Sequence, residues 1–179
     1  MNFNFNKQKF LELIKEYKTL SLKGKYLFDF DKVKNDELTI YLTFLDDNTA
    51  YLSKKKYFQI IESFINQKIT VNEFIYQYSE LRRSNFNQSE MLQKNLEAEA
   101  LSGLIQESKI DLQLNPKCEG FTDILSYIDN DIDLFDENIS FEMNLNNLEL
   151  IGYGLSEEFF RQNMQDNFML LIGKYCNIK

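Results

Sequence analysis

The chain has 179 residues, a hydrophobic share of 44%, only one proline and six glycines, and a formal net charge of −8. These values exclude a disordered chain and a loop-rich β-sandwich, and they predict a globular fold with a sizeable core. Histidine is absent from the sequence, which excludes Ser-His-Asp and Cys-His catalysis as well as imidazole metal ligands.

The charge is unevenly spread along the sequence. Residues 1–70 hold 12 lysines and 9 acidic residues, whereas residues 71–179 hold 8 basic and 19 acidic residues. An acidic C-terminal part repels nucleic acid and membrane phosphates and attracts a basic protein surface. The simpler alternative is that this acidity only keeps the protein soluble.

The two cysteines, Cys118 and Cys176, have no metal-type or redox-type spacing, so a disulfide framework is not expected. The N-terminus lacks the long apolar run of a signal peptide. The longest late apolar run, residues 168–172, is far shorter than the roughly 20 residues of a spanning helix. The sequence therefore predicts a soluble protein of a reducing compartment, most simply the cytoplasm.

The first predicted helix covers residues 7–22, with Gly24 as its terminator, and residues 25–35 are expected to form a polar connection. Residues 38–45 fit both a strand and a helix, because apolar residues alternate there but also recur at helical spacing. Their threonine and aromatic content favours a strand. A small β element is then expected, with residues 139–151 as the pairing partner, since a lone strand leaves unpaired edges.

Residues 53–83 read as two amphipathic helices joined by a tight turn. Thr70 and Glu73 have the spacing of a capping box, in which each side chain accepts a hydrogen bond from the other residue's backbone N–H. A short connection at residues 84–88 and a long helix over residues 89–109, with Ser89 as its N-cap, are expected next.

A short helix over residues 121–128, an acidic tract over residues 129–137 and a final helix capped by Ser156 complete the predicted order. The predicted fold is mainly α, an antiparallel bundle of about five helices with a small β element. Residues 1–50 are expected to supply an N-terminal helix and an extension packed on the core, and residues 51–179 one compact helical domain.

The acidic tract opens like the D-x-D-x-D of a calcium loop, but Leu134 stands where that loop needs glycine and Ser140 where it needs glutamate. No metal, cofactor or catalytic residue is therefore predicted. The tract is either a solvated loop or a contact surface that mimics a line of phosphates for a cationic partner. The candidate partner-binding residues are Asp129, Asp131, Asp133, Asp136 and Glu137.

The hairpin YFQIIESFINQKITVNEFIYQYSEL (residues 57–81) resembles the colicin D immunity protein family and its immunity-like relatives. A second likeness lies in residues 121–160, where a short helix and an acidic tract precede a final helix that begins LSEEFF. The resemblance implies a helical bundle that binds a nuclease toxin, typically one that cuts tRNA, and occludes its active site. The family is not enzymatic, so no catalytic residue carries over.

Three functional hypotheses follow from these features. The first is an immunity-like protein that blocks a basic nuclease toxin through an acidic helical surface, without binding nucleic acid or membrane. The second is a non-enzymatic scaffold or assembly subunit of a larger complex. The third is an enzyme that uses carboxylates as acid and base or as metal ligands, which stabilisation by a divalent cation would reveal.

Overall fold

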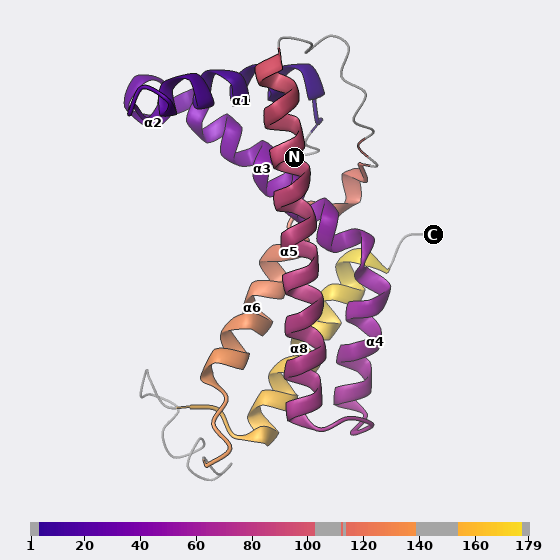
Figure 1. Cartoon of the computed structure of the whole chain (residues 1–179). Helices are drawn as coiled ribbons and strands as arrows, with labels where there is room; N and C mark the ends of the chain where they lie inside the picture. Colours follow the sequence, from indigo (N-terminus) through magenta and orange to yellow (C-terminus); the bar gives the residue numbers. More distant parts are fainter. Residues whose placement is uncertain (1–3, 103–111, 113, 139–153, 177–179) are drawn as a thin grey trace. The chain divides into compact units, whose positions relative to one another are not determined.

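The computed structural model describes residues 4–102, 112, 114–138 and 154–176 (Figure 1). The helices in chain order are α1 (Lys7–Ser21), α2 (Leu27–Phe30), α3 (Lys32–Leu52), α4 (Lys54–Ile65), α5 (Val71–Ser102), the 3-10 helix η2 (Pro116–Cys118), α6 (Phe121–Leu134) and α8 (Glu157–Tyr175). Within these ranges no strand is present, and a single isolated bridge joins Phe135 to Leu155. The prediction of a mainly α fold is confirmed. None of the helices described is long and apolar enough to cross a membrane.

The chain divides into two compact units. Unit 1 comprises Met1–Thr49 and Ser84–Glu119, and unit 2 comprises Ala50–Arg83 and Gly120–Lys179. The first part of unit 1 thus ends at Thr49, and residues 84–119 group with this N-terminal part of the chain. The reason is burial, because the apolar face of the second half of α5 completes the core of unit 1.

The core of unit 1 is built from one face each of α1, α3 and α5. Its buried members are Phe10, Leu11, Leu13, Ile14, Leu27, Leu38, Tyr41, Leu45, Leu96 and Ala100. The ring of Phe10 stacks on that of Tyr41 at 5.2 Å between centroids, and Phe5 packs edge-on against both rings. α1 ends as predicted, because Gly24 takes the left-handed conformation at φ 67° just after it.

The strand predicted over residues 38–45 is wrong, because these residues form the middle of α3. Burial decides between the two periodicities: Leu38, Tyr41 and Leu45 are buried at helical spacing, whereas Ile40 is half exposed. The hydroxyl of Thr39 donates to the carbonyl of Asn35 at 2.9 Å, so this threonine is accommodated within the helix. The proposed partner segment, residues 139–151, lies outside the described residues.

Two predicted connections are also helical. Residues 25–35 contain α2 and the start of α3, and residues 84–88 lie inside the uninterrupted α5. Ser89 is not an N-cap, because its buried hydroxyl donates to the carboxylate of Asp46 on α3. A polar side chain that looks like a helix start thus serves a contact between helices.

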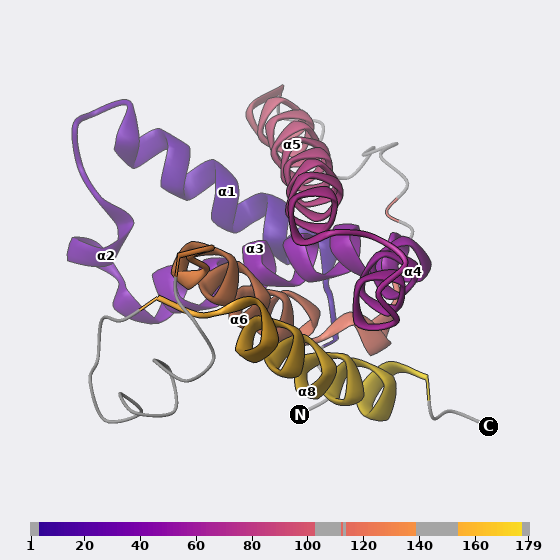
Figure 2. The same ribbon diagram turned by 90° about the horizontal axis from the view of Figure 1, so that it is seen from below.

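Unit 2 contains α4, the first part of α5, α6 and α8, with α6 packed beside α8 (Figure 2). Its core is aromatic: the rings of Phe64 and Phe74 stack at 4.5 Å, and Phe160 packs against both at 5.4 and 5.7 Å. The predicted capping box is confirmed. The N–H of Thr70 donates to the Glu73 carboxylate at 2.8 Å, and the N–H of Glu73 donates to the Thr70 hydroxyl at 3.3 Å. The hydrogen bonds that the Glu73 carboxylate accepts from the N–H and the hydroxyl of Thr70 hold its pKa below its ordinary value.

The C-termini of α1 and α4 use the same hydrogen-bonded turn with different residues. After α4, the N–H of Lys68 donates to the Ser63 carbonyl at 2.8 Å and that of Gln67 donates to the Phe64 carbonyl at 3.0 Å. This is the Schellman pattern, whose left-handed position is usually glycine. Gln67 occupies that position at φ 56°, where Gly24 stands in the equivalent turn after α1.

We expect Gln67→Gly to raise the free energy of unfolding by about 0.5–1 kcal/mol. Holding a residue with a side chain in the left-handed conformation costs about 1–2 kcal/mol, and glycine avoids this cost. Glycine also loses more conformational entropy on folding, which cancels part of the gain. Urea denaturation measures the change. Gln67→Ala is the matched control and should bring no gain, because alanine keeps the side-chain clash.

Candidate functional site

The five acidic residues predicted to form one surface do not all lie on the surface of unit 2. Two of them make contacts between helices, and three lie at the end of α6. Asp129, Asp131 and Asp133 lie on α6, and Asp136 and Glu137 follow directly after it. Because a helix turns about 100° per residue, alternate residues do not share a face. The tract therefore forms neither a calcium loop nor a single line of charge.

Asp129 holds α6 to α5. Its carboxylate accepts from Nε of Arg82 at 3.2 and 3.1 Å, one bond to each oxygen, and from Nη2 at 2.6 Å. Beside this pair the buried hydroxyl of Tyr78 donates to the Leu125 carbonyl at 2.9 Å. Asp129 is thus committed to a contact between two helices of the same unit, and its role in partner binding is at most indirect.

Asp131 faces the opposite neighbour, α8. Its two carboxylate oxygens accept from the side-chain amides of Asn163 at 3.0 Å and Asn167 at 3.2 Å. Burial raises the pKa of Asp131, because it disfavours the charged form, and the two amide donors partly offset this rise. Asp131 is therefore a second internal contact.

Asp131 should make the stability of the protein depend on pH. A carboxyl whose pKa is raised by folding stabilises the protein fully below its unfolded pKa, about 3.9, and this stabilisation is lost as pH rises through the folded pKa. Asp131→Asn has no proton to lose at this position. Its free energy of unfolding should therefore increase relative to that of the natural protein as pH rises through the folded pKa, which urea denaturation at a series of pH values measures. Asn130→Ser, an exposed change without a titrating proton, should differ from the natural protein by the same amount at every pH.

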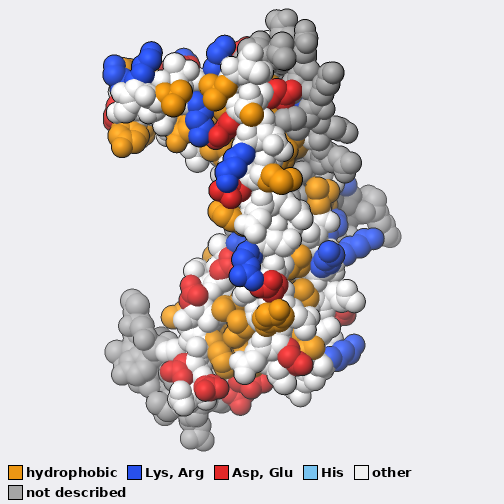
Figure 3. Space-filling view, viewed as in Figure 1, with side chains coloured by type: hydrophobic (Ala, Val, Ile, Leu, Met, Phe, Trp, Pro, Cys, Tyr) orange, Lys and Arg blue, Asp and Glu red, His pale blue; other side chains and the backbone are white. Residues whose placement is uncertain are grey.

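The remaining three residues, Asp133, Asp136 and Glu137, come together and are here called the acidic rim. They line a hollow of about 590 Å³ with Asn72 at the start of α5 and with Gly154. Asp133 and Glu137 are exposed, and Asp136 accepts two hydrogen bonds of 2.9 Å from Asn138. Figure 3 shows acidic side chains gathered at this end of unit 2.

The acidic rim stands at the unfavourable end of its helix. A helix C-terminus carries partial negative charge, and each acidic residue placed there costs about 0.3–1 kcal/mol at low salt. The last turn of α6 holds no basic residue. In contrast, the acidic residues Glu73 and Glu157 lie in first turns, where the helix dipole favours them. The helix dipole thus accounts for the positions of Glu73 and Glu157, but it does not account for the positions of the acidic rim.

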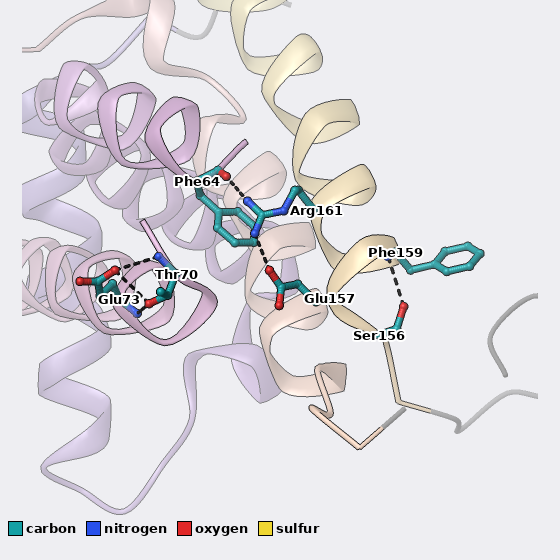
Figure 4. A network of polar contacts seen from close by, with 7 residues as sticks. All are labelled: Phe64, Thr70, Glu73, Ser156, Glu157, Phe159 and Arg161. Carbon is teal, nitrogen blue, oxygen red and sulfur yellow. Dashed lines mark hydrogen bonds and ion pairs between the residues drawn. The ribbon is translucent and has the colours of Figure 1, made fainter. Parts of the chain in front are cut away.

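A second opening, a groove of about 970 Å³, lies between the α4–α5 turn and the start of α8. Arg161 fixes its wall: the guanidinium stacks 4.0 Å from the centre of the Phe64 ring and donates to the Phe64 carbonyl (Figure 4). It also donates to the carboxylate of Glu157 at 2.6 Å. Half-buried Ile65 and Ile69 contribute apolar surface, and exposed Glu158 contributes a further carboxylate.

The sequence alone did not predict this groove. The proximity of α8 to the α4–α5 turn depends on contacts between residues almost a hundred positions apart. No local pattern marks such a contact.

The chemistry available to these residues is limited. Among the residues described, no three Cys, Asp or Glu side chains are grouped so as to hold a metal ion. Both cysteines are free thiols, and burial raises the pKa of Cys118 to about 12, so this thiol stays protonated at neutral pH. What the site presents is exposed negative charge beside an open, partly apolar groove.

Comparisons of the chain with protein-family models, with curated proteins and with solved structures found no match.

Proposed function

We propose that this chain is an immunity-like protein that binds a basic nuclease toxin through the acidic end of unit 2 and blocks its active site. The observation that carries the proposal is the acidic rim, three carboxylates placed where the α6 dipole disfavours them. Residues that lower stability are often retained because they serve binding or catalysis.

Electrostatics gives the acidic rim a specific role in binding. A nuclease that cuts RNA presents a basic surface to the phosphates of its substrate. Exposed carboxylates on a rigid helical end can occupy the positions of those phosphates and accelerate encounter. The resemblance of the α4–α5 hairpin to the colicin D immunity protein family supports the same partner class, and the confirmed capping box gives that hairpin the expected local structure.

The test is binding to a basic nuclease encoded beside this chain, measured by stopped-flow association and by inhibition of tRNA cleavage. We expect the triple variant Asp133→Asn, Asp136→Asn, Glu137→Gln to associate about tenfold or more slowly at low salt, because steering by opposite charge contributes a factor of this order. The difference should shrink as salt is added, since screening weakens the natural protein more than the variant.

The matched control removes the same three charges from exposed positions of unit 1, through Glu12→Gln, Asp36→Asn and Glu90→Gln. If the control slows association as much as the rim variant, net charge alone is responsible and the rim assignment fails. If the natural protein neither binds nor inhibits the nuclease, the proposed function fails.

A further inference from the structure

Unit 1 exposes large hydrophobic side chains where α2 joins α1 to α3, a turn here called the apolar tip (Figure 1). Its members and their exposed fractions are Leu22 (83%), Tyr26 (72%), Phe28 (53%), Phe30 (60%) and Val33 (77%). In α2 itself only Leu27 is buried. Single exposed hydrophobic residues are normal, but several of them within one short stretch mark an interaction surface.

The exposed charge of the apolar tip is mainly positive. Its exposed lysines are Lys23, Lys25 and Lys32, and Figure 3 shows basic and hydrophobic side chains together at this end of unit 1. Of the two acidic residues in the stretch 22–33, Asp31 is half-buried, accepts from the backbone N–H of Lys34 at 3.0 Å and lies 3.8 Å from the Lys34 ammonium. Asp29 is exposed. Three exposed lysines against one exposed aspartate favour a partner of negative charge.

Each ring of α2 lies beside a lysine. The Lys32 ammonium is 5.8 Å from the centre of the Phe28 ring, and the Lys25 ammonium is 5.1 Å from the centre of the Phe30 ring. Phe28 and Phe30 are alternate residues of one helical turn, so their side chains leave the helix about 200° apart. The apolar tip therefore exposes apolar groups in more than one direction, and each ring has a positive charge close to it.

This arrangement favours a lipid surface over an acidic protein. The main anchors of a protein interface cluster in well-packed pockets near its centre, whereas the two rings of α2 do not share a face. A fluid bilayer accommodates apolar side chains that leave a turn in different directions. Aromatic and leucine side chains enter the boundary between headgroups and acyl chains, and lysine side chains are long enough to keep their ammonium groups among the headgroup phosphates.

We propose that the apolar tip docks unit 1 on an anionic lipid surface, with Phe28 and Phe30 in the bilayer interface and the three lysines at the headgroup phosphates. The expectation that the chain avoids membranes comes from the acidity of residues 71–179, and the apolar tip lies outside that range. Interactions between exposed charges more than about 8 Å apart are largely screened at physiological salt, so the charge of the tip itself decides. This inference is independent of the proposed nuclease binding, which uses unit 2.

Tryptophan fluorescence tests the proposal directly, because the chain contains no tryptophan. Phe28→Trp and Phe30→Trp each place a single reporter in the apolar tip. With vesicles rich in phosphatidylserine, the emission of each should shift to shorter wavelength and be quenched by brominated acyl chains, because the indole leaves water. Phe86→Trp, at a comparably exposed position of α5, is the matched control and should keep the emission of an indole in water.

Co-sedimentation of the full chain with the same vesicles separates the contributions of charge and apolar surface. The triple variant Lys23→Gln, Lys25→Gln, Lys32→Gln should bind about a hundredfold more weakly, because each lysine near an anionic surface strengthens binding about fivefold. Phe28→Ser with Phe30→Ser should bind about tenfold or more weakly. Asp29→Asn should bind more tightly than the natural protein, since it removes the opposing charge.

The matched charge control is Lys55→Gln, Lys56→Gln, Lys68→Gln, which removes three exposed lysines from unit 2 and should bind the vesicles normally. The proposal is overturned if the natural protein does not bind phosphatidylserine vesicles, and an acidic protein then becomes the candidate partner of the tip. It is also overturned if neutral phosphatidylcholine vesicles bind equally well, or if the serine variant binds as tightly as the natural protein.

Discussion

Replacing Phe74 with alanine should lower the free energy of unfolding by about 3–5 kcal/mol, the range typical of a buried phenylalanine. Its side chain is fully buried at the centre of unit 2. The ring stacks on Phe64 at 4.5 Å, packs along Tyr78 at 5.6 Å and meets Phe160 at 5.7 Å. Alanine would therefore leave a cavity bounded by three other rings, which cannot collapse into it without losing their own contacts.

Equilibrium denaturation in urea measures this loss. Tyr76→Ala is the matched control, because Tyr76 lies two residues away on the same helix but is mostly exposed; its effect should stay within about 0.5 kcal/mol. Phe74→Leu should fall between the two, since it keeps part of the volume. A loss of less than about 1.5 kcal/mol for Phe74→Ala would mean that this cluster relaxes around the cavity and is not tightly packed.

Phe10→Ala should have a similar effect in unit 1, also about 3–5 kcal/mol. Phe10 is fully buried in the face of α1 that packs on α3, where it stacks on Tyr41. Tyr17→Ala, on the same helix but with 37% of its surface exposed, should cost clearly less.

Amide hydrogen exchange distinguishes the two substitutions further. Local stability is not uniform within a protein, so each cavity should first increase exchange in the helices that line it. Phe10→Ala should raise exchange in α1, and Phe74→Ala should raise it in α4 and α8. If both variants raised exchange in the same helices, the division into two cores would be contradicted.

Features encoded by neighbouring residues were predictable from the sequence. The α4–α5 hairpin follows from helical periodicity on both sides of one capping box, and the end of α1 follows from a glycine in a left-handed turn. Each of these depends on residues fewer than ten positions apart. The same local rules mark Ser156 as the N-cap of α8, where its hydroxyl accepts from the N–H of Phe159 at 3.4 Å.

The failures come from contacts distant in sequence. Residues 38–45 carry threonines that favour a strand, but the packing of their helical face on α1 outweighs this preference. In the acidic tract, the roles of Asp129 and Asp131 depend on Arg82 and Asn163, which are 47 and 32 positions away. The sequence indicated the negative charge of the site, but only the fold separates the two carboxylates that hold helices together from the three at the end of α6.

The position of the acidic rim links the stability of unit 2 to whatever neutralises it. Without a partner, the carboxylates lie at the negative end of the α6 dipole, so salt alone should raise the melting temperature by screening this repulsion. A cationic protein bound there would remove the same repulsion. Because it binds only the folded state, its binding would also raise the free energy of unfolding. If such a protein binds there, the unbound form would open more readily at this end and be cleaved first by proteases, so the lifetime of the chain would depend on the presence of the bound protein.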